Sequence, residues 1–260
     1  MQISAVIIAG NEEQKIGDAI RSLSWADEIL VIDSESIDGT REIASSLGAR
    51  VIVRPWPGFS KQKQFGVDAA ANDWIFSLDA DEVVSQELAE EIKQIKNSVR
   101  SPADGYKIPR LSLYMNREIR HSGWYPDWQL RLFDRRCGAW SDDIVHESFR
   151  MTEGSRVEKL NGNIVHQSYS SAAEHHEMIG TRYAPLAARQ MFERGRRTSR
   201  FKVATAPAAA FLSSYVLKAG FLDGLPGYCI ARFAAHHAYM KHLCLWELQT
   251  TALQPKTRPE

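Results

Sequence analysis

Four short apolar runs alternate with helical patterns in the first part of the chain, and this alternation constrains the fold more than any other feature. The runs occupy residues 3–9, 28–33, 51–53 and 74–78. After the first run, apolar residues recur from Ile16 to Leu23 at the spacing of one helix face. Strands that alternate with helices are typical of right-handed β-α-β units. We therefore expect an α/β fold with a mostly parallel central sheet flanked by helices.

Carboxylates follow two of these runs. Asp33 closes the second run, and Asp79 and Asp81 follow the apolar stretch 74–78. Because ligands of open α/β sheets bind beyond the carboxyl ends of the strands, we expect these side chains at one edge. Two Asp residues at i and i+2 of an extended segment point the same way, and hard divalent cations prefer carboxylate oxygen. The alternative is that Asp79 and Asp81 only precede a helix that begins near Ser85.

The balance of charge excludes one class of partner. The 260 residues contain 32 basic and 32 acidic side chains, so the chain as a whole has no positive charge to attract nucleic acid, and no nucleic-acid partner is expected. The cysteines Cys137, Cys229 and Cys244 have neither metal-site spacing nor the density of a disulfide framework, which favours a reducing compartment. The first residues run directly into a strand pattern, so we expect no signal peptide.

The sequence contains no glycine-rich phosphate loop. Gly10 is followed by Asn11 and Glu12, so no G-x-G-x-x-G motif follows the first run, and there is no Walker lysine loop. Dinucleotide-binding and P-loop functions therefore lose their main support. A carboxylate site without such a loop must bind a diphosphate through a metal ion. Asp33 would then accept a hydrogen bond from a base edge, such as the N3–H of uracil.

Three sequence blocks resemble the family 2 inverting glycosyltransferases, which have the GT-A fold. The blocks are residues 3–13, residues 31–40 (Val-Ile-Asp-Ser-Glu-Ser-Ile-Asp-Gly-Thr) and residues 77–82 (Ser-Leu-Asp-Ala-Asp-Glu). The resemblance implies four contacts to a nucleotide-sugar donor: Asn11, Glu12, Asp33 and Asp79. Asp33 would hold the nucleobase, Asp79 would lie near the ribose and sugar, and Asp81 would ligate Mg²⁺ or Mn²⁺ on the donor diphosphate. Glu82 is expected to belong to the approach to the next helix.

A later segment is rich in aromatic residues and contains one candidate base. An inverting sugar transfer needs a group that takes the proton from the acceptor hydroxyl, and we assign this role to Asp127. Its neighbours Trp124, Tyr125 and Trp128 offer flat faces for a sugar ring, and their bulk can raise the pKa of a carboxyl by desolvation. The alternative is that Asp127 caps a turn while the aromatic residues belong to a core.

The same segment carries a second resemblance. The block Gly-Trp-Tyr-Pro-Asp-x-Gln-x-Arg-Leu-Phe at residues 123–133 resembles the acceptor-side motif of family 2 glucosyltransferases of the bacterial lipopolysaccharide core. Gln129 and Arg131 would alternate with Leu130 and Leu132 on a strand. Gln129 is therefore expected on the acceptor side, and Arg131 is expected to meet a phosphate of the donor or acceptor.

Histidines close two further apolar runs. A histidine in this position is more often structural than a ligand, but the resemblance implies that His166 joins Asp81 at the metal. His146 and Glu147 would contact the acceptor or brace Asp127, and the sequence does not separate these uses. The pair at 175–176 is expected on a solvated helix face.

Positive charge is concentrated late in the chain. Residues 182–202 contain seven basic side chains against the single acid Glu193, and the uncharged stretch 203–217 follows. Pro207 interrupts this stretch, which is also shorter than the roughly 20 residues of a membrane-spanning helix, so we expect helices that lie in a membrane interface. The alternative is an ordinary helical subdomain with a solvated basic face. The expected regions are a GT-A domain at 1–180, a basic amphipathic helical region at 181–250 and a polar tail at 251–260.

These features predict a metal-dependent inverting glycosyltransferase. The resemblance to β-1,4-glucosyltransferases of the lipopolysaccharide inner core implies UDP-glucose as donor and a lipid-linked core saccharide as acceptor. The enzyme would bind an anionic membrane surface as a peripheral protein on the cytoplasmic side of the bacterial inner membrane. A polyprenyl-phosphate or capsule acceptor is a second interpretation.

Two other classes of protein share parts of this pattern. A catalytically silent nucleotide-sugar-binding membrane scaffold would keep Asp33 and the fold, but it would not need a base such as Asp127. Nucleotidyltransferases share the sheet and the carboxylate-bound metal, but the chain has no glycine- and lysine-rich loop at its N-terminus to bind a triphosphate.

Overall fold

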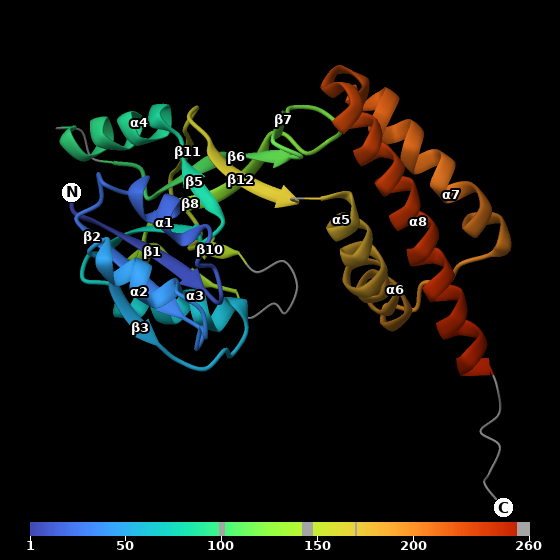
Figure 1. The fold of residues 1–260 in the computed structure, drawn as a ribbon, viewed down its shortest axis with the longest axis horizontal. Coiled ribbons are helices and arrows are strands. Elements are labelled where there is room, and N and C mark those ends of the chain that lie inside the picture. The colour runs from blue at the N-terminus through green and yellow to red at the C-terminus, as the bar shows by residue number, and fades with distance from the viewer. Residues whose placement is uncertain (99–101, 142–147, 170, 254–260) are drawn as a thin grey trace, which may run out of the picture. The chain divides into compact units, whose positions relative to one another are not determined.

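The computed structural model describes residues 1–98, 102–141, 148–169 and 171–253 (Figure 1). The chain divides into two compact units. Unit 1 comprises Met1–Leu111 with Pro126–His166, and unit 2 comprises Ser112–Tyr125 with Gln167–Glu260. The expected regional division at residues 180 and 250 stays a prediction.

Unit 1 is built on four parallel strands. They are β1 (Ile3–Ala9), β2 (Glu28–Asp33), β3 (Arg50–Val53) and β4 (Trp74–Asp79). β1 is central, is buried along its whole length and pairs with both β2 and β4. The register sets Ala9 opposite Asp33 and Ile8 opposite Asp79. The two carboxylates therefore end neighbouring strands at one edge of the sheet, as expected from the sequence.

Further strands, most of them in antiparallel pairs, extend the sheet beyond β4, and β11 pairs with β6 in parallel. The strand order is β3-β2-β1-β4-β8-β6-β12-β5, with β7 and β11 also paired to β6. Their bounds are β5 (Glu82–Val84), β6 (Gly105–Tyr114), β7 (Arg117–Ile119), β8 (Asp127–Asp134), β11 (Val157–Lys159) and β12 (Ile164–Tyr169). A separate pair follows the 3-10 turn η1 (Arg135–Cys137), formed by β9 (Gly138–Trp140) and β10 (Phe149–Met151). The expected α/β fold with helices flanking a central sheet is confirmed.

Helices cover both faces of this sheet. They are α1 (Ile16–Arg21), α2 (Thr40–Ser46), α3 (Phe59–Ala69) and α4 (Gln86–Asn97). Residues of α1, α2 and α4 join the larger core cluster, whereas Val67 of α3 joins the cluster on the other face. Helix α3 approaches the sheet closely at Gly66, where an added Cβ would lie 2.5 Å from Val6 Cγ1.

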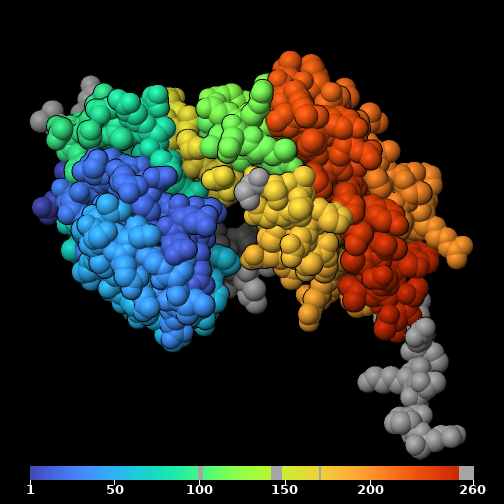
Figure 2. Space-filling view, in the orientation of Figure 1, coloured from blue at the N-terminus to red at the C-terminus, as the bar shows by residue number. Residues whose placement is uncertain are grey.

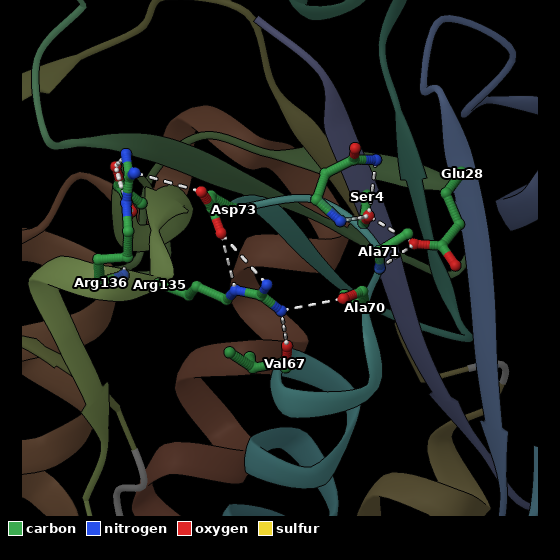
Figure 3. Close-up of polar contacts among 10 residues, drawn as sticks. Ser4, Glu28, Val67, Ala70, Ala71, Asp73, Arg135 and Arg136 are labelled. Carbon is green, nitrogen blue, oxygen red and sulfur yellow. Dashed lines mark hydrogen bonds and ion pairs between the residues drawn. The ribbon is translucent and has the colours of Figure 1, made fainter.

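The amino-terminal ends of the strands form a separate polar network (Figure 3). The Glu28 carboxylate accepts hydrogen bonds from the Ser4 hydroxyl at 2.5 Å and from the Ala71 N–H at 2.7 Å. Arg135 donates to the last carbonyls of α3, Val67 O and Ala70 O, at 3.1 and 2.9 Å. Carbonyls at a helix end have no partner within the helix, so these contacts stabilise the fold at the end of the sheet away from Asp33.

Unit 2 is mainly helical. Its helices are α5 (Ala172–Met178), the π-helix η2 (Ile179–Tyr183), α6 (Ala184–Glu193), α7 (Arg200–Leu212), the π-helix η3 (Ser213–Leu217), the 3-10 turn η4 (Gly220–Asp223) and α8 (Gly224–Leu253). Helix α8 packs against both α6 and α7. Within the part of the chain that the structure describes, no helix combines the length and apolar character needed to cross a bilayer.

Candidate active site

Asp33 organises the loop that follows β2. Its carboxylate accepts hydrogen bonds from the Ser36 N–H at 2.9 Å and from the Ser36 hydroxyl at 2.5 Å, and the side chain is fully buried. The Ser36 hydroxyl oxygen in turn accepts from the Asn11 N–H at 2.8 Å. Asp33 thus stabilises the loop after β2. Its direct contact with a nucleobase stays a prediction.

Asn11 and Glu12 join the loops after β1 and β2. The Asn11 side-chain oxygen accepts from the Ile37 N–H at 2.9 Å, and the Glu12 N–H donates to the Thr40 hydroxyl at 2.8 Å. Burial raises the pKa of Glu12, and the charge of Asp81 raises it further against the opposing charge of Lys15. The two predicted donor residues therefore lie at the same edge as the predicted metal ligand. Contact with a donor is untested.

Asp79 lies between two cations. Lys63 Nζ of α3 is 3.0 Å from Asp79 Oδ1, and Arg131 Nη2 of β8 is 3.0 Å from Asp79 Oδ2. Burial alone would raise the pKa of Asp79, but the charges of Lys63 and Arg131 hold it well below its usual range. Since a short turn and β5 separate Asp79 from α4, whose N-cap is Ser85, Asp79 does not cap that helix.

Glu82 lies just before α4, as expected, and it is also a member of the site. It begins β5, its side chain is fully buried, and its Oε1 accepts a hydrogen bond from Arg131 Nη2 at 2.7 Å. Glu82 Oε2 accepts from the Asp79 N–H at 3.0 Å. Burial raises the pKa of Glu82, although the charge of Arg131 opposes this shift. Arg131 is thus engaged by two carboxylates, and its contact with a phosphate stays a prediction.

Asp127 begins β8 and is held by two side chains. Arg110 Nη2 and Nε lie 2.7 and 2.9 Å from Asp127 Oδ2, and Gln129 Nε2 donates to Asp127 Oδ1 at 2.7 Å. Arg110 is the register partner of Asp127 across β6 and β8, and Gln129 shares its face at i+2. The carboxylate is therefore oriented by strand pairing and does not cap a turn.

These contacts form one chain of alternating charge. Arg110 Nη1 also lies 3.5 Å from Glu82 Oε1, which connects the Asp127 pair to the Asp79 pair. In order, the chain is Lys63, Asp79, Arg131, Glu82, Arg110 and Asp127. Each side chain in this series lies beside side chains of the opposite charge type, which is the arrangement that partly buried charged groups require. Neither Lys63 nor Arg110 was among the residues predicted from the sequence.

Asp81 and His166 form a second, smaller pair. Asp81 Oδ2 lies 3.3 Å from His166 Nε2, at the turn between β4 and β5. Burial alone would raise the pKa of Asp81, but the hydrogen bond and charge of His166 outweigh burial and lower it. No group of three or more His, Cys, Asp or Glu side chains suited to a metal occurs among the described residues.

The predicted aromatic residues divide between the two units. Trp128 lies in unit 1, where Lys159 Nζ is 4.4 Å from its ring centroid. Trp124 lies in unit 2 within a cluster of rings, 5.9 Å from Tyr114 and 6.2 Å from His175 between centroids. Arg120 lies over the Tyr125 ring at 5.4 Å. Trp124 therefore behaves as a core residue of unit 2, and acceptor binding by all three residues stays a prediction. His146 and Glu147 lie outside the described residues.

The expectation of a solvated face at residues 175–176 is wrong for one of the two. His175 is buried and stacks on Tyr169 with ring centroids 4.1 Å apart, while its Nδ1 lies 3.2 Å from the Tyr114 hydroxyl. His176 is exposed. The sequence did not show which of the two histidines is buried. Adjacent residues of a helix point in different directions, and only His175 points toward the aromatic rings.

Comparison with known proteins identifies a family. The family model described as glycosyl transferase family 2 matches residues 4–152, which is more than half of the chain. An uncharacterised glycosyltransferase of Rickettsia typhi is 32% identical over 258 residues, covering 95% of this chain and 87% of that protein. The lipopolysaccharide core biosynthesis glycosyltransferase LpsC of Rhizobium meliloti is 26% identical over 261 residues, covering 98% of this chain and 96% of LpsC.

A solved structure also resembles the chain. The crystal structure of glucosyl-3-phosphoglycerate synthase from Mycobacterium tuberculosis, in complex with Mn²⁺, UDP and glucosyl-3-phosphoglycerate, has a TM-score of 0.47 and 18% sequence identity. The similarity covers 76% of this chain and 81% of that one. The region matched by the family model includes all the candidate carboxylates and excludes His166.

Proposed function

Because the chain belongs to glycosyl transferase family 2, we propose that it moves a hexose from a nucleotide-diphosphate sugar to a saccharide hydroxyl, with inversion at the anomeric carbon. The proposed donor is UDP-glucose, and the proposed acceptor is the inner core of lipopolysaccharide. The likeness to a lipopolysaccharide core enzyme over nearly the whole of both chains supports this acceptor. The motif around Asp33 supports a uracil nucleotide.

One observation supports the proposal that the protein catalyses a transfer. The donor-edge residue Asp79 and the candidate base Asp127 belong to a single chain of buried and half-buried charges, with Arg131, Glu82 and Arg110 between them. A protein that only binds a nucleotide sugar has no use for a carboxylate held in this way beyond the donor edge. Such orientation of a reacting group is a general source of catalytic rate.

Asp127 would take the proton from the acceptor hydroxyl. A carboxylate has about four lone-pair positions. Oδ2 accepts from two nitrogens of Arg110 and Oδ1 accepts from Gln129, which leaves a position on Oδ1 for the incoming hydroxyl. Arg110 Nη1 also lies 3.5 Å from Glu82 Oε1. Arg110 and Gln129 would thus set the direction of the proton transfer.

Asp81 and His166 would hold a divalent cation, Mg²⁺ or Mn²⁺. Adjacent ligands of an octahedral ion are about 3 Å apart, and the Asp81 Oδ2 to His166 Nε2 distance of 3.3 Å fits two such positions. Asp79 does not fit as a ligand here, because each of its oxygens faces a cation. When bound, the cation would offset the negative charge of the departing diphosphate.

The decisive experiment measures UDP release and product formation by the purified full-length chain. UDP-sugars are tested against truncated lipopolysaccharide cores, a polyprenyl phosphate and capsule saccharides. We expect turnover with UDP-glucose and a core acceptor only. Turnover with another acceptor alone would replace the proposed acceptor, and metal-dependent UDP binding without any turnover would favour a silent binding protein.

Two variants test the assigned roles. Asp127→Asn should abolish turnover and leave UDP affinity unchanged, whereas Asp68→Asn on the exposed face of α3 should change neither. Asp81→Ala should weaken metal-dependent UDP binding. Retained turnover in Asp127→Asn would remove Asp127 from the role of base.

A further inference from the structure

Unit 2 carries an exposed apolar surface where α7 turns back into α8. Six large apolar side chains are each at least half exposed there, from 50% for Phe221 to 81% for Leu217. They are Leu212, Val216, Leu217, Phe221, Leu222 and Leu225, and we call this group the apex. The segment that contains them, in orange and red, forms an uncovered part of the surface in Figure 2.

The apex is a built structure. Asp223 accepts hydrogen bonds from the N–H groups of Arg120 and His121 at 3.2 and 3.0 Å, and its Oδ1 lies 2.8 Å from His121 Nδ1. Gly220 and Gly227 allow close backbone approach, because a Cβ on Gly227 would overlap the Gly220 carbonyl. The exposed side chains are therefore held outward by fixed contacts within unit 2.

Helix α7 extends this surface away from the apex. None of its 13 residues is buried. At 100° per residue, Phe201, Ala208 and Leu212 lie within about 40° of one another around the helix axis, and all three are exposed. Arg200 and Lys202 fall to either side of this line. The outer face of α7 is thus an apolar line, interrupted by Thr205, whose hydroxyl donates to the Phe201 carbonyl. Basic side chains lie beside its first turn.

The charge of this region has one sign. No Asp or Glu occurs from Arg194 to Leu222, whereas six basic residues do. They are Arg194, Arg196, Arg197, Arg200, Lys202 and Lys218. The chain as a whole is neutral, so this segment concentrates positive charge beside an exposed apolar surface. An isologous contact with a second copy would bring these like charges together, which disfavours self-association.

We propose that the outer face of α7 and the apex bind an anionic lipid bilayer, with α7 lying in the plane of the interface. Five of the six basic residues, Arg194 to Lys202, lie before α7 or in its first turn, and the apex begins at its last residue (Figure 1). The two ends of this 13-residue helix are roughly 18 Å apart at 1.5 Å per residue. A flat surface reaches both ends only when the helix lies along it. Tyr215 and Tyr228, whose rings pack with Phe211 beneath the apex, are of the type that favours the headgroup region.

Vesicle binding tests this surface without any sugar donor or acceptor, so failure here leaves the proposed transfer reaction untouched. The full chain is sedimented with vesicles of phosphatidylcholine alone or mixed with phosphatidylglycerol. Binding should be at least about tenfold tighter to the anionic vesicles, because several basic side chains near such a surface each contribute attraction. Equal binding to both vesicles, or to neither, would overturn the proposal.

Matched variants separate the apolar and basic contributions. The triple variant Leu217→Ser, Leu222→Ser, Leu225→Ser should lose most vesicle binding, whereas Leu186→Ser, which is 48% exposed on α6, should not. Arg196→Glu with Lys202→Glu should lose the preference for anionic vesicles, and Lys61→Glu with Lys93→Glu in unit 1 should keep it. Unchanged binding in both test variants would contradict the assignment.

Two further measurements keep the proposal testable if the variants misfold, and test for self-association. In the unaltered protein, hydrogen exchange of residues 212–222 should slow on addition of anionic vesicles, whereas that of residues 59–69 should not change. Sedimentation velocity should show no dimer that depends on Leu217, Leu222 and Leu225. Such a dimer would assign the face to a second copy and overturn the proposal.

Discussion

At the residue scale, Arg110 positions the candidate base. It contacts Asp127 through two nitrogens from the paired strand, and a lysine cannot reproduce that planar contact. We expect Arg110→Lys to lower kcat by about 10- to 100-fold, the size of effect that misplacement of a reacting group produces. Affinity for UDP should not change. Steady-state kinetics and UDP titration measure both quantities.

The control for this variant is Arg21→Lys. Arg21 is exposed on α1 and forms an ion pair with Asp18, which is not part of the charge chain. A change of KM without a change of kcat would show that Arg110 acts in binding. Unchanged kinetics would show that Gln129 alone is sufficient to orient Asp127.

Glu82 is the residue on which the charge chain depends for stability. It is fully buried between Arg131 and Arg110. Replacing it by Gln keeps its shape but leaves Arg131 with less compensation, and removing one partner of a buried ion pair costs about 3–5 kcal/mol. Urea unfolding should show a decrease of this order for Glu82→Gln. The exposed Glu87→Gln on α4 should stay within about 0.5 kcal/mol of the parent chain. A similar small change for Glu82→Gln would mean that Asp79 alone balances Arg131.

The sequence predicts the acidic half of this site better than the basic half. Asp33, Asp79 and Asp81 stand at the ends of strands or just beyond them, where the fold class itself marks a ligand edge. The basic partners of Asp79, Glu82 and Asp127 come from α3, β6 and β8. The pairing of Arg110 with Asp127 depends on an antiparallel register that no local pattern encodes. Lys63 offered one usable signal, since it stands one turn from Gly66 on the buried face of α3.

At the scale of elements, regular periodicity explains what could be predicted. The strands at residues 3–9 and 28–33 have the expected bounds, and α4 begins after Ser85 as its capping pattern indicates. The GT-A α/β fold expected from the resemblance is confirmed. The short strand β5 was missed, because three residues carry too little pattern to distinguish a strand from a helix approach.

Helix α5 gives unit 2 a dependence on pH through His175. Burial lowers the pKa of His175 to about 4, so between that pH and about 6.5 the unfolded chain binds a proton that the folded chain does not. Stability is therefore full above pH 6.5 and decreases as the pH falls towards 4. The loss should be roughly 3 kcal/mol at about 1.4 kcal/mol per pKa unit.

Unfolding measured between pH 7 and 4 tests this slope. His175→Phe keeps a ring between Tyr169 and Phe233 and should flatten the pH dependence, whereas the exposed His176→Phe should preserve it. A slope that is the same in His175→Phe and the parent chain would place the proton uptake at other groups, such as His236 or His237, whose pKa values burial also lowers.

At the scale of the whole molecule, the two units differ in how they use charge. In unit 1, six charges alternate and compensate one another at close range in a chain of buried and half-buried side chains, so added salt affects them less than it affects fully exposed charges. In unit 2, the segment from Arg194 to Leu222 carries uncompensated positive charge on exposed side chains. The neutral total therefore conceals two electrostatic arrangements that respond differently to ionic strength.

Ionic strength should separate the two proposed activities in one protein. Raising the salt concentration from about 0.1 M to about 1 M shortens the Debye length from about 10 Å to about 3 Å, which screens exposed charges from an anionic surface. Transfer to an acceptor embedded in anionic vesicles should then fall together with vesicle binding. Transfer to a water-soluble truncated core saccharide should fall much less, because the groups around Asp127 and Asp79 are compensated by near partners. An equal loss with both acceptors would show that salt acts on the catalytic unit, and an equal retention would show that the basic segment does not bring the enzyme to its acceptor.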